Sequence, residues 1–284
     1  MLADRAVSEN IHFRILEDIA RDLSGDINFP TCMDAAILVR NTLKDPFADL
    51  GRVAQVIGIE PLISSKLLRL ANSVRYNPAG TAINQLSVAV SRLGFEVVRT
   101  VSLAVAMDQM LKSRNLAVFD RIAHAFWEHS IQVAAIARVL ARRVGRISPD
   151  EAMLAGLVHD IGIFYLLYRA AEYPEYRSNQ AAVFELLRGW HESIGESLLY
   201  ILGLPEHVVE AVREHDQFSA IQSPTTLADV LYLANLLAGL DPEWQEIDGD
   251  PADAEKREAD RLRYADLMEE AAEDIQELRS SLGA

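Results

Sequence analysis

The segment SPDEAMLAGLVHDIGIFYL, which begins at Ser148, constrains the fold more than any other part of the sequence. Ser148 followed by proline, with Glu151 three residues on, is the capping box of a helix N-terminus. Apolar residues then recur at the spacing of one buried helical face, at Leu154, Leu157, Val158 and Ile161. The pattern predicts one buried helix over residues 148–170 that holds His159 and Asp160 beside its apolar face. Polar side chains in such a place need partners from elsewhere in the chain.

The composition predicts a folded protein with a large core. Half of the 284 residues are hydrophobic and the mean hydropathy is +0.06, which suits one large domain or two subdomains. The net charge is −15, so the surface as a whole repels nucleic acid and anionic membranes, and neither is an expected partner. A single cysteine, Cys32, read as an ordinary buried thiol, and the absence of a leader-like or membrane-spanning run predict a cytoplasmic protein.

Helical periodicity recurs along the chain, and no stretch keeps the alternation of a β-strand. The predicted helices, separated by breaks such as Gly94, are 10–23, 33–43, 50–57, 61–72, 85–93, 96–110, 118–144, 148–170, 179–203, 205–216, 224–239 and 252–281. We therefore predict an all-α fold in which an N-terminal helical subdomain packs on a helical bundle. The predicted parts are an entry helix (1–24), the N-terminal subdomain (25–114), the bundle (115–240) and an acidic linker with a C-terminal helix (241–284).

The acidity is concentrated at the end of the chain, where residues 241–284 hold 15 acidic and 5 basic side chains. The C-terminal helix predicted there has a limited apolar stripe, so we interpret it as solvated, with a partner-binding or homodimer surface as the alternative. Four arginines are interpreted as a solvated helix face that complements the helix dipole: Arg138, Arg142, Arg143 and Arg146. The three tryptophans are interpreted as packing residues: Trp127, Trp190 and Trp244.

Three further histidines share apolar helical faces with the histidine-aspartate pair. His129, His191 and His215 each come from a different predicted helix, and each falls in register with apolar neighbours. Four inward histidines predict convergence on one interior site, and separate structural hydrogen bonds are the alternative. Imidazole together with carboxylate is the ligand mix that binds Zn, Mn, Fe or Ni, and bundle interiors are where such sites form.

The order of these residues resembles the HD superfamily of metal-dependent phosphohydrolases. The resemblance implies that His129, His159 and Asp160 hold a divalent metal with a fourth ligand at Asn235, and that Asp160 would be the catalytic residue in an active enzyme. It leaves a second candidate set in His191, His215 and Asp216. The bundle is then expected to be of the HD type.

The N-terminal half carries a closer resemblance, to the HDOD domain of bacterial signalling proteins. The matching segments are a DP element, a second acidic-proline element at Glu60, the helix LLRLANS and the run AVSRLG. Together they place the resemblance over about residues 20–240. The resemblance implies a regulatory signal-transduction module with protein partners, and a small phosphorylated molecule as a further candidate ligand.

Two departures weaken the case for catalysis. Asn235 stands where active HD enzymes carry an aspartate, and a neutral amide is a poorer ligand for a hard cation. The His-His pair and Gly-Tyr-Pro loop of enzymes that cleave cyclic dinucleotides are replaced by His215-Asp216 and QFSAIQSPTTL. Asp229, 6 residues before Asn235, falls on another helical face and is not expected to substitute. We therefore predict a regulatory module whose metal is weakly bound or absent, with a metal-dependent phosphohydrolase of nucleotides or other phosphoesters as the alternative.

Overall fold

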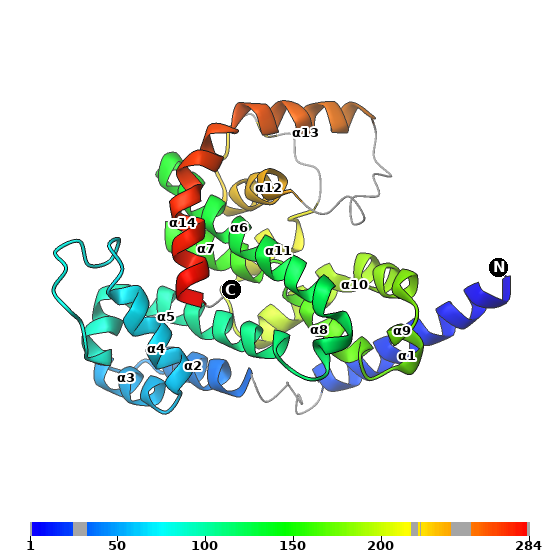
Figure 1. The fold of residues 1–284 in the computed structure, drawn as a ribbon, viewed down its shortest axis with the longest axis horizontal. Helices are drawn as coiled ribbons and strands as arrows, with labels where there is room; N and C mark the ends of the chain where they lie inside the picture. The colour runs from blue at the N-terminus through cyan, green and yellow to red at the C-terminus, as the bar shows by residue number, and fades with distance from the viewer. Residues whose placement is uncertain (1, 25–32, 217–220, 222, 240–250, 283–284) are drawn as a thin grey trace.

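The computed structural model describes residues 2–24, 33–216, 221, 223–239 and 251–282, and every regular element in these ranges is a helix. The all-α prediction is confirmed (Figure 1). The helices are α1 (Leu2–Ser24), α2 (Asp34–Lys44), α3 (Leu50–Gly58), α4 (Pro61–Ala71), α5 (Leu86–Leu111), the short 3-10 helix η2 (Leu116–Phe119), α6 (Asp120–Val144), α7 (Pro149–Val158), α8 (Ile161–Ala170), α9 (Pro174–Arg177), α10 (Gln180–Ile201), α11 (Glu206–Arg213), α12 (Leu227–Ala238), α13 (Pro251–Arg263) and α14 (Asp266–Leu282). Cys32 and Trp244 lie outside the described residues.

Helices α2, α3 and α4 pack on α5, which in turn contacts α7 of the bundle formed by α6 to α12. Figure 1 shows α2 to α5 at one end of the molecule and α1 leading away at the other. Helix α5 joins the two segments predicted at 85–93 and 96–110, and it bends between them. The bend lies at Gly94, whose φ of 79° falls in the left-handed region that glycine adopts without strain.

The segment 148–170 forms two helices where the sequence predicted one. Ser148 accepts a hydrogen bond from the backbone N–H of Glu151, as predicted for the N-cap, but α7 ends at Val158 and α8 begins at Ile161. His159 and Asp160 therefore form the junction between two buried helices. Local periodicity did not reveal the break, since both helices are apolar on nearly all sides. This stretch is long and apolar enough to cross a membrane, but 89% of it is buried within the protein, which accounts for its composition.

The C-terminal segment also differs from its prediction, because it forms α13 and α14 with a break at Tyr264 and Ala265. Helix α14 buries one face and exposes the other. It runs alongside α6 and reaches α4 and α5 (Figure 1). The side chains that it buries against the rest of the chain include Leu267, Ala271, Leu278 and Leu282. Its apolar stripe is thus covered within the same chain, by a surface that the sequence had not paired with it.

The interpretation of the four arginines as a solvated face is wrong for Arg138, while Arg142 and Arg143 are exposed but paired with acidic residues of α14. Arg138 is fully buried, with its Nε 3.1 Å from Asp274 and its NH2 group 2.9 Å from Glu277. Arg142 lies 2.9 Å from the same Asp274 carboxylate, and Arg143 pairs with α14 further along. A charged helix face looks the same in sequence whether water or an acidic helix covers it. Arg146 is exposed, as predicted.

The prediction that the tryptophans are packing residues holds for one of the two that the structure describes. Trp127 is buried and its ring meets Phe164 edge-on, with the centroids 6.4 Å apart. Trp190 is 43% exposed, so its interpretation as a packing residue is wrong. It belongs to the outer face of α10, one residue before the buried His191.

Candidate metal centre

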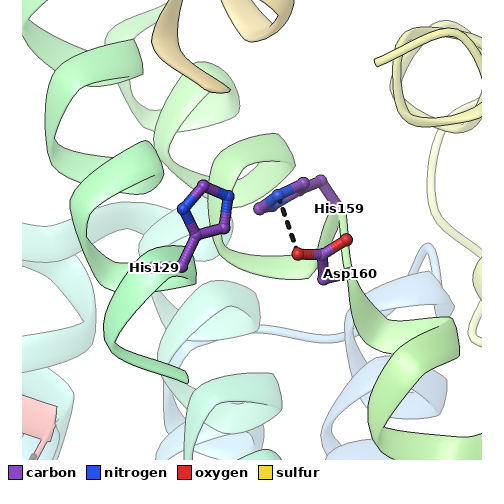
Figure 2. Close-up of side chains that lie close together, drawn as sticks. All are labelled: His129, His159 and Asp160. Atoms are coloured by element: carbon purple, nitrogen blue, oxygen red, sulfur yellow. Dashed lines mark ion pairs between the residues drawn. The ribbon is translucent and has the colours of Figure 1, made fainter. Parts of the chain in front are cut away.

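His129, His159 and Asp160 lie together in the interior of the bundle. One ligand atom from each lies within 4.8 Å of the others, and all three side chains are buried. Figure 2 shows the His129 ring from α6 turned toward the junction of α7 and α8, where His159 and Asp160 stand side by side. The structure therefore brings together three of the candidate ligands that the sequence grouped.

Two glycines allow the helices to approach closely enough to form this cluster. A Cβ on Gly156 would lie 2.7 Å from the Cα of Ala134, so α7 contacts the backbone of α6 directly. A Cβ on Gly162 would lie 2.8 Å from the backbone nitrogen of Gly195 and nearer still to the carbonyl of His191, so α8 contacts α10 in the same way. Sequence reasoning overlooked these residues. Their signal was glycine inside an apolar helical pattern, which indicates a packing role.

His159 presents an unsatisfied nitrogen to the site. Its Nδ1 lies 2.8 Å from the carbonyl of Gly156, to which it donates, so Nε2 is the nitrogen that would carry the lone pair of a neutral ring. Nε2 is 3.1 Å from Asp160 Oδ2 but not in hydrogen-bonding geometry, and within the described residues this buried atom has no hydrogen-bond partner. A metal ligand needs such a lone pair, with the other ring nitrogen fixed by a carbonyl.

Asp160 is held in its ionised form. Burial raises the free energy of its carboxylate, but the facing His159 and His215 rings outweigh that cost and keep the pKa of Asp160 well below its ordinary value. The His215 Nε2 is 3.5 Å from Asp160 Oδ1. A buried carboxylate between two imidazoles is available as a ligand at neutral pH.

His129 and Asn235 make a contact that no single neutral tautomer satisfies. His129 Nδ1 lies 2.9 Å from the carbonyl of Gly239, and its Nε2 lies 2.9 Å from Asn235 Oδ1. Both partners are acceptors, whereas a neutral imidazole has one N–H. Burial lowers the pKa of His129 to about 4, so the doubly protonated ring is disfavoured at neutral pH. If Nδ1 donates to Gly239, two lone pairs face each other across 2.9 Å, an arrangement that a cation bound by both atoms would relieve.

The second candidate set adjoins the first. The His215 Nε2 is 3.4 Å from Asp216 Oδ1, and His191 Nε2 is 3.2 Å from Asp216 Oδ2. Ligand atoms of Asp160, His191 and His215 also lie within 4.8 Å of one another, so the two sets share Asp160. All seven predicted residues therefore belong to one connected cluster.

The carboxylates stabilise protonated histidines in this second set. Burial opposes the charge on His215, but Asp216 and Asp160 overcome it and raise its pKa to about 10. Burial likewise opposes the charge on His191, and the hydrogen bond to Asp216 raises its pKa. Burial would raise the pKa of Asp216, but His215 and His191 together lower it. Protons on these rings would compete with a second metal for the same nitrogen atoms.

One residue of the cluster was missed. Glu192 joins His191 and Asp216 in a third group of potential ligands on the more exposed side. It follows His191 directly on α10. The sequence prediction considered only residues in register with apolar neighbours, and Glu192 lies outside that register. Asp229 serves instead in the capping box of α12, with Thr226, which agrees with its exclusion from the ligand set.

These residues fit a transition-metal ion. Imidazole nitrogens with a carboxylate and an amide oxygen are typical ligands of Zn, Mn, Fe or Ni. The unsatisfied Nε2 of His159 and the facing acceptors of His129 and Asn235 both have lone pairs available for a cation. Three imidazole or amide donors and one carboxylate supply a single formal negative charge, which predicts modest affinity.

Comparisons with known proteins identify a family and similar folds. The HDOD domain profile matches residues 29–218. A "Putative metal-dependent phosphohydrolase" from Shewanella amazonensis SB2B superposes with a TM-score of 0.72 at 22% identity, over 97% of this chain and 99% of the other. An HDOD domain protein of unknown function from Geobacter sulfurreducens gives 0.59 at 20% identity, over 95% and 99%.

A "Putative signal transduction protein" from Marinobacter aquaeolei VT8 gives a TM-score of 0.57 at 20% identity, over 96% of this chain and 66% of the other. At these identities the likeness to solved structures extends to the fold alone. No match was found among curated proteins. The matched segment stops before α12, so Asn235 and the whole C-terminal arm of α13 and α14 lie beyond it.

Proposed function

The chain belongs to the HDOD domain family, and from that premise we propose that it is a regulatory signal-transduction module that acts by binding protein partners in the cytoplasm. Its interior site is proposed to hold one divalent transition metal weakly, as a structural or ligand-sensing element. Neither nucleic acid nor a membrane is a proposed partner, because the net charge of −15 opposes both.

The observation that carries this proposal is the contact of Asn235 with Asp216. Asn235 Nδ2 donates to Asp216 Oδ1 over 2.9 Å, while Asp216 Oδ2 lies 3.2 Å from His191. Both oxygens of that carboxylate are therefore engaged by neighbours. An aspartate at position 235 would instead add a second negative charge next to His129. The amide favours a hydrogen bond to Asp216 over a second negative charge at the metal site.

His129, His159 and Asp160 are the residues that would hold the metal, with Asn235 as the weak fourth ligand. A bound divalent ion would polarise a phosphoryl oxygen or acidify a water molecule. The chain itself supplies orientation, since carbonyls of Gly239 and Gly156 fix the two histidine rings. It also excludes bulk water from the site, because His159 and Asp160 are almost fully buried.

The alternative function is a metal-dependent phosphohydrolase of nucleotides or other phosphoesters, in which Asp160 would be the catalytic residue. One observation favours it. Glu192 and Asp216 are half-buried, as is Asn235, and both lie next to His191, so a phosphorylated ligand could reach the site from their side. Such a ligand need not be hydrolysed, and a small phosphorylated molecule also suits a sensing role.

Hydrolysis assays decide between the two. The purified protein would be incubated with cyclic dinucleotides, nucleotides and a generic phosphodiester, in the presence of Mn, Fe, Ni or Zn. We expect no appreciable turnover. Turnover that disappears in both His159→Ala and Asp160→Ala, with unchanged circular dichroism, would establish the phosphohydrolase instead. Affinity purification with the wild type and His159→Ala as matched baits then tests whether partner binding depends on the site.

A further inference from the structure

The C-terminal arm, defined as α13 and α14, contacts the chain immediately beside two residues of the metal centre. On α14, Arg279 NH2 lies 2.7 Å from Glu128 Oε2, and Glu128 directly precedes His129. On α13, Arg261 Nε lies 3.3 Å from the carbonyl of Leu236, which directly follows Asn235. One continuous arm thus touches both helices that face each other across the contact between His129 and Asn235.

The arm is firmly attached along α6. Ion pairs between the two helices run antiparallel, from Arg143 with Asp266 at one end, through Arg138 with Asp274, to Glu128 with Arg279 at the other. The middle pair is buried, with Arg138 fully inaccessible. Because a buried guanidinium that loses its partner is costly, this pair holds α14 to α6 in one register.

The arm is also attached to the N-terminal half. Arg75, in the segment after α4, lies 2.8 Å from Asp274 Oδ1, so one carboxylate joins it to the arginines of α6. Lys66 and Arg69 of α4 donate to the last carbonyls of α14, at Leu282 and Ser280. Cations at a helix C-terminus are favourable partners for its dipole. The end of α14 nearest to Glu128 is therefore fixed from both sides.

We propose that the C-terminal arm is a positioning element of the metal centre, in which Arg279 and Arg261 hold α6 and α12 so that His129 Nε2 and Asn235 Oδ1 converge on one ion. The proposal rests on the metal site proposed above and names what sets its affinity. The arm does not touch the ion. It acts through Glu128, which precedes His129, and through Leu236, which follows Asn235. Arg279 holds the first of these residues and Arg261 the second.

A matched pair of substitutions tests this role. Arg279→Met removes an ion pair between α14 and α6 at the end next to His129, and Arg143→Met removes one at the far end. The two arginine side chains are 33% and 38% exposed, respectively. Exposed pairs contribute little to stability, so both variants should fold. Metal binding is measured by competition with a chromophoric chelator, using Mn and Zn. We expect Arg279→Met to weaken metal binding about 3- to 10-fold, since residues that contact metal ligands typically change affinity about 10- to 100-fold and Arg279 is one step further away. Arg143→Met should leave metal binding unchanged.

A second readout does not need metal. The side-chain nitrogen shifts of His129 in the metal-free protein report its contacts with Asn235 and Gly239, and they should change in Arg279→Met but not in Arg143→Met. Arg279→Lys, which keeps the charge, should recover most of both effects. Equal metal affinity and equal shifts in the two methionine variants would overturn the positioning role. If the wild type binds no metal while the His129 shifts still respond to Arg279→Met, the metal site proposal fails and the positioning role stands.

Discussion

The carboxylate of Asp274 binds the guanidinium of Arg138 at 3.1 Å, and the two residues, 136 positions apart, join the last helix of the chain to the middle of α6. Asp274 also receives Arg75 and Arg142, so three arginines share one carboxylate. Arg138 in turn has Glu277 as a second partner. Asp274 thus links the last helix both to α6 and, through Arg75, to the N-terminal half, so its loss should affect both.

Asp274→Asn should destabilise the protein more than Arg138→Met. Asparagine removes the shared charge and leaves buried Arg138 with Glu277 alone, at a cost of about 3–5 kcal/mol in the free energy of unfolding. Arg138→Met leaves Asp274 with Arg75 and Arg142, so its cost should be smaller. Urea denaturation monitored by circular dichroism measures both. An equal loss in the free energy of unfolding for both substitutions would mean that the Asp274 charge shared by the three arginines adds nothing beyond its pair with Arg138.

Gly162→Ala should damage the site through packing. The new methyl group would collide with the backbone of α10 at His191 and Gly195, which cannot move aside as a flexible side chain would. Overpacking of this kind costs about 1–3 kcal/mol. The control is Gly189→Ala on α10, where a Cβ meets nothing within 4 Å and alanine should stabilise the helix by about 0.5–1 kcal/mol. Thermal denaturation of the two variants should therefore shift in opposite directions.

Asn235→Asp should raise metal affinity. Aspartate would add a negative charge beside His129 and replace an amide oxygen with a carboxylate oxygen, and we expect at least about a 10-fold gain. Isothermal titration with Mn or Zn measures it, with Asp229→Asn as a control that alters the α12 capping box but not the cluster. An unchanged dissociation constant would show that position 235 does not supply a ligand.

Added transition metal should stabilise the wild type against heat, since a ligand that binds only the folded state shifts the unfolding equilibrium. At a metal concentration about 100-fold above the dissociation constant, the gain is about 2.7 kcal/mol. Chelator should reverse the shift, and His159→Ala should abolish it because it removes the unsatisfied Nε2. An equal shift in His159→Ala would place the stabilising ion elsewhere. Elemental analysis of the purified protein should find less than one metal per chain.

Most of the helices, and every member of the cluster except Glu192, could be predicted from the sequence alone. Spacing on apolar faces predicted that His129, His191 and His215 point inward, and the structure places all three with His159 and Asp160 because buried polar groups require partners. Local signals also predicted the cap at Ser148 and an interruption at Gly94, where the structure bends one helix instead of separating two, and each depends on a few adjacent residues. What is encoded within one or two helical turns could be predicted from the sequence.

Which surfaces cover one another could not be predicted from local sequence signals. Arg138 looked like a solvated residue because nothing within its own helix indicates Asp274, far along the chain. The break at Asp160 and the close approach at Gly162 depend on where α10 lies, which periodicity does not specify. The neutral Asn235 was visible in the sequence, but its bond to Asp216 was not. Hydrophobic spacing shows that a face is buried, whereas charge pairing and backbone contact depend on the partner that buries it.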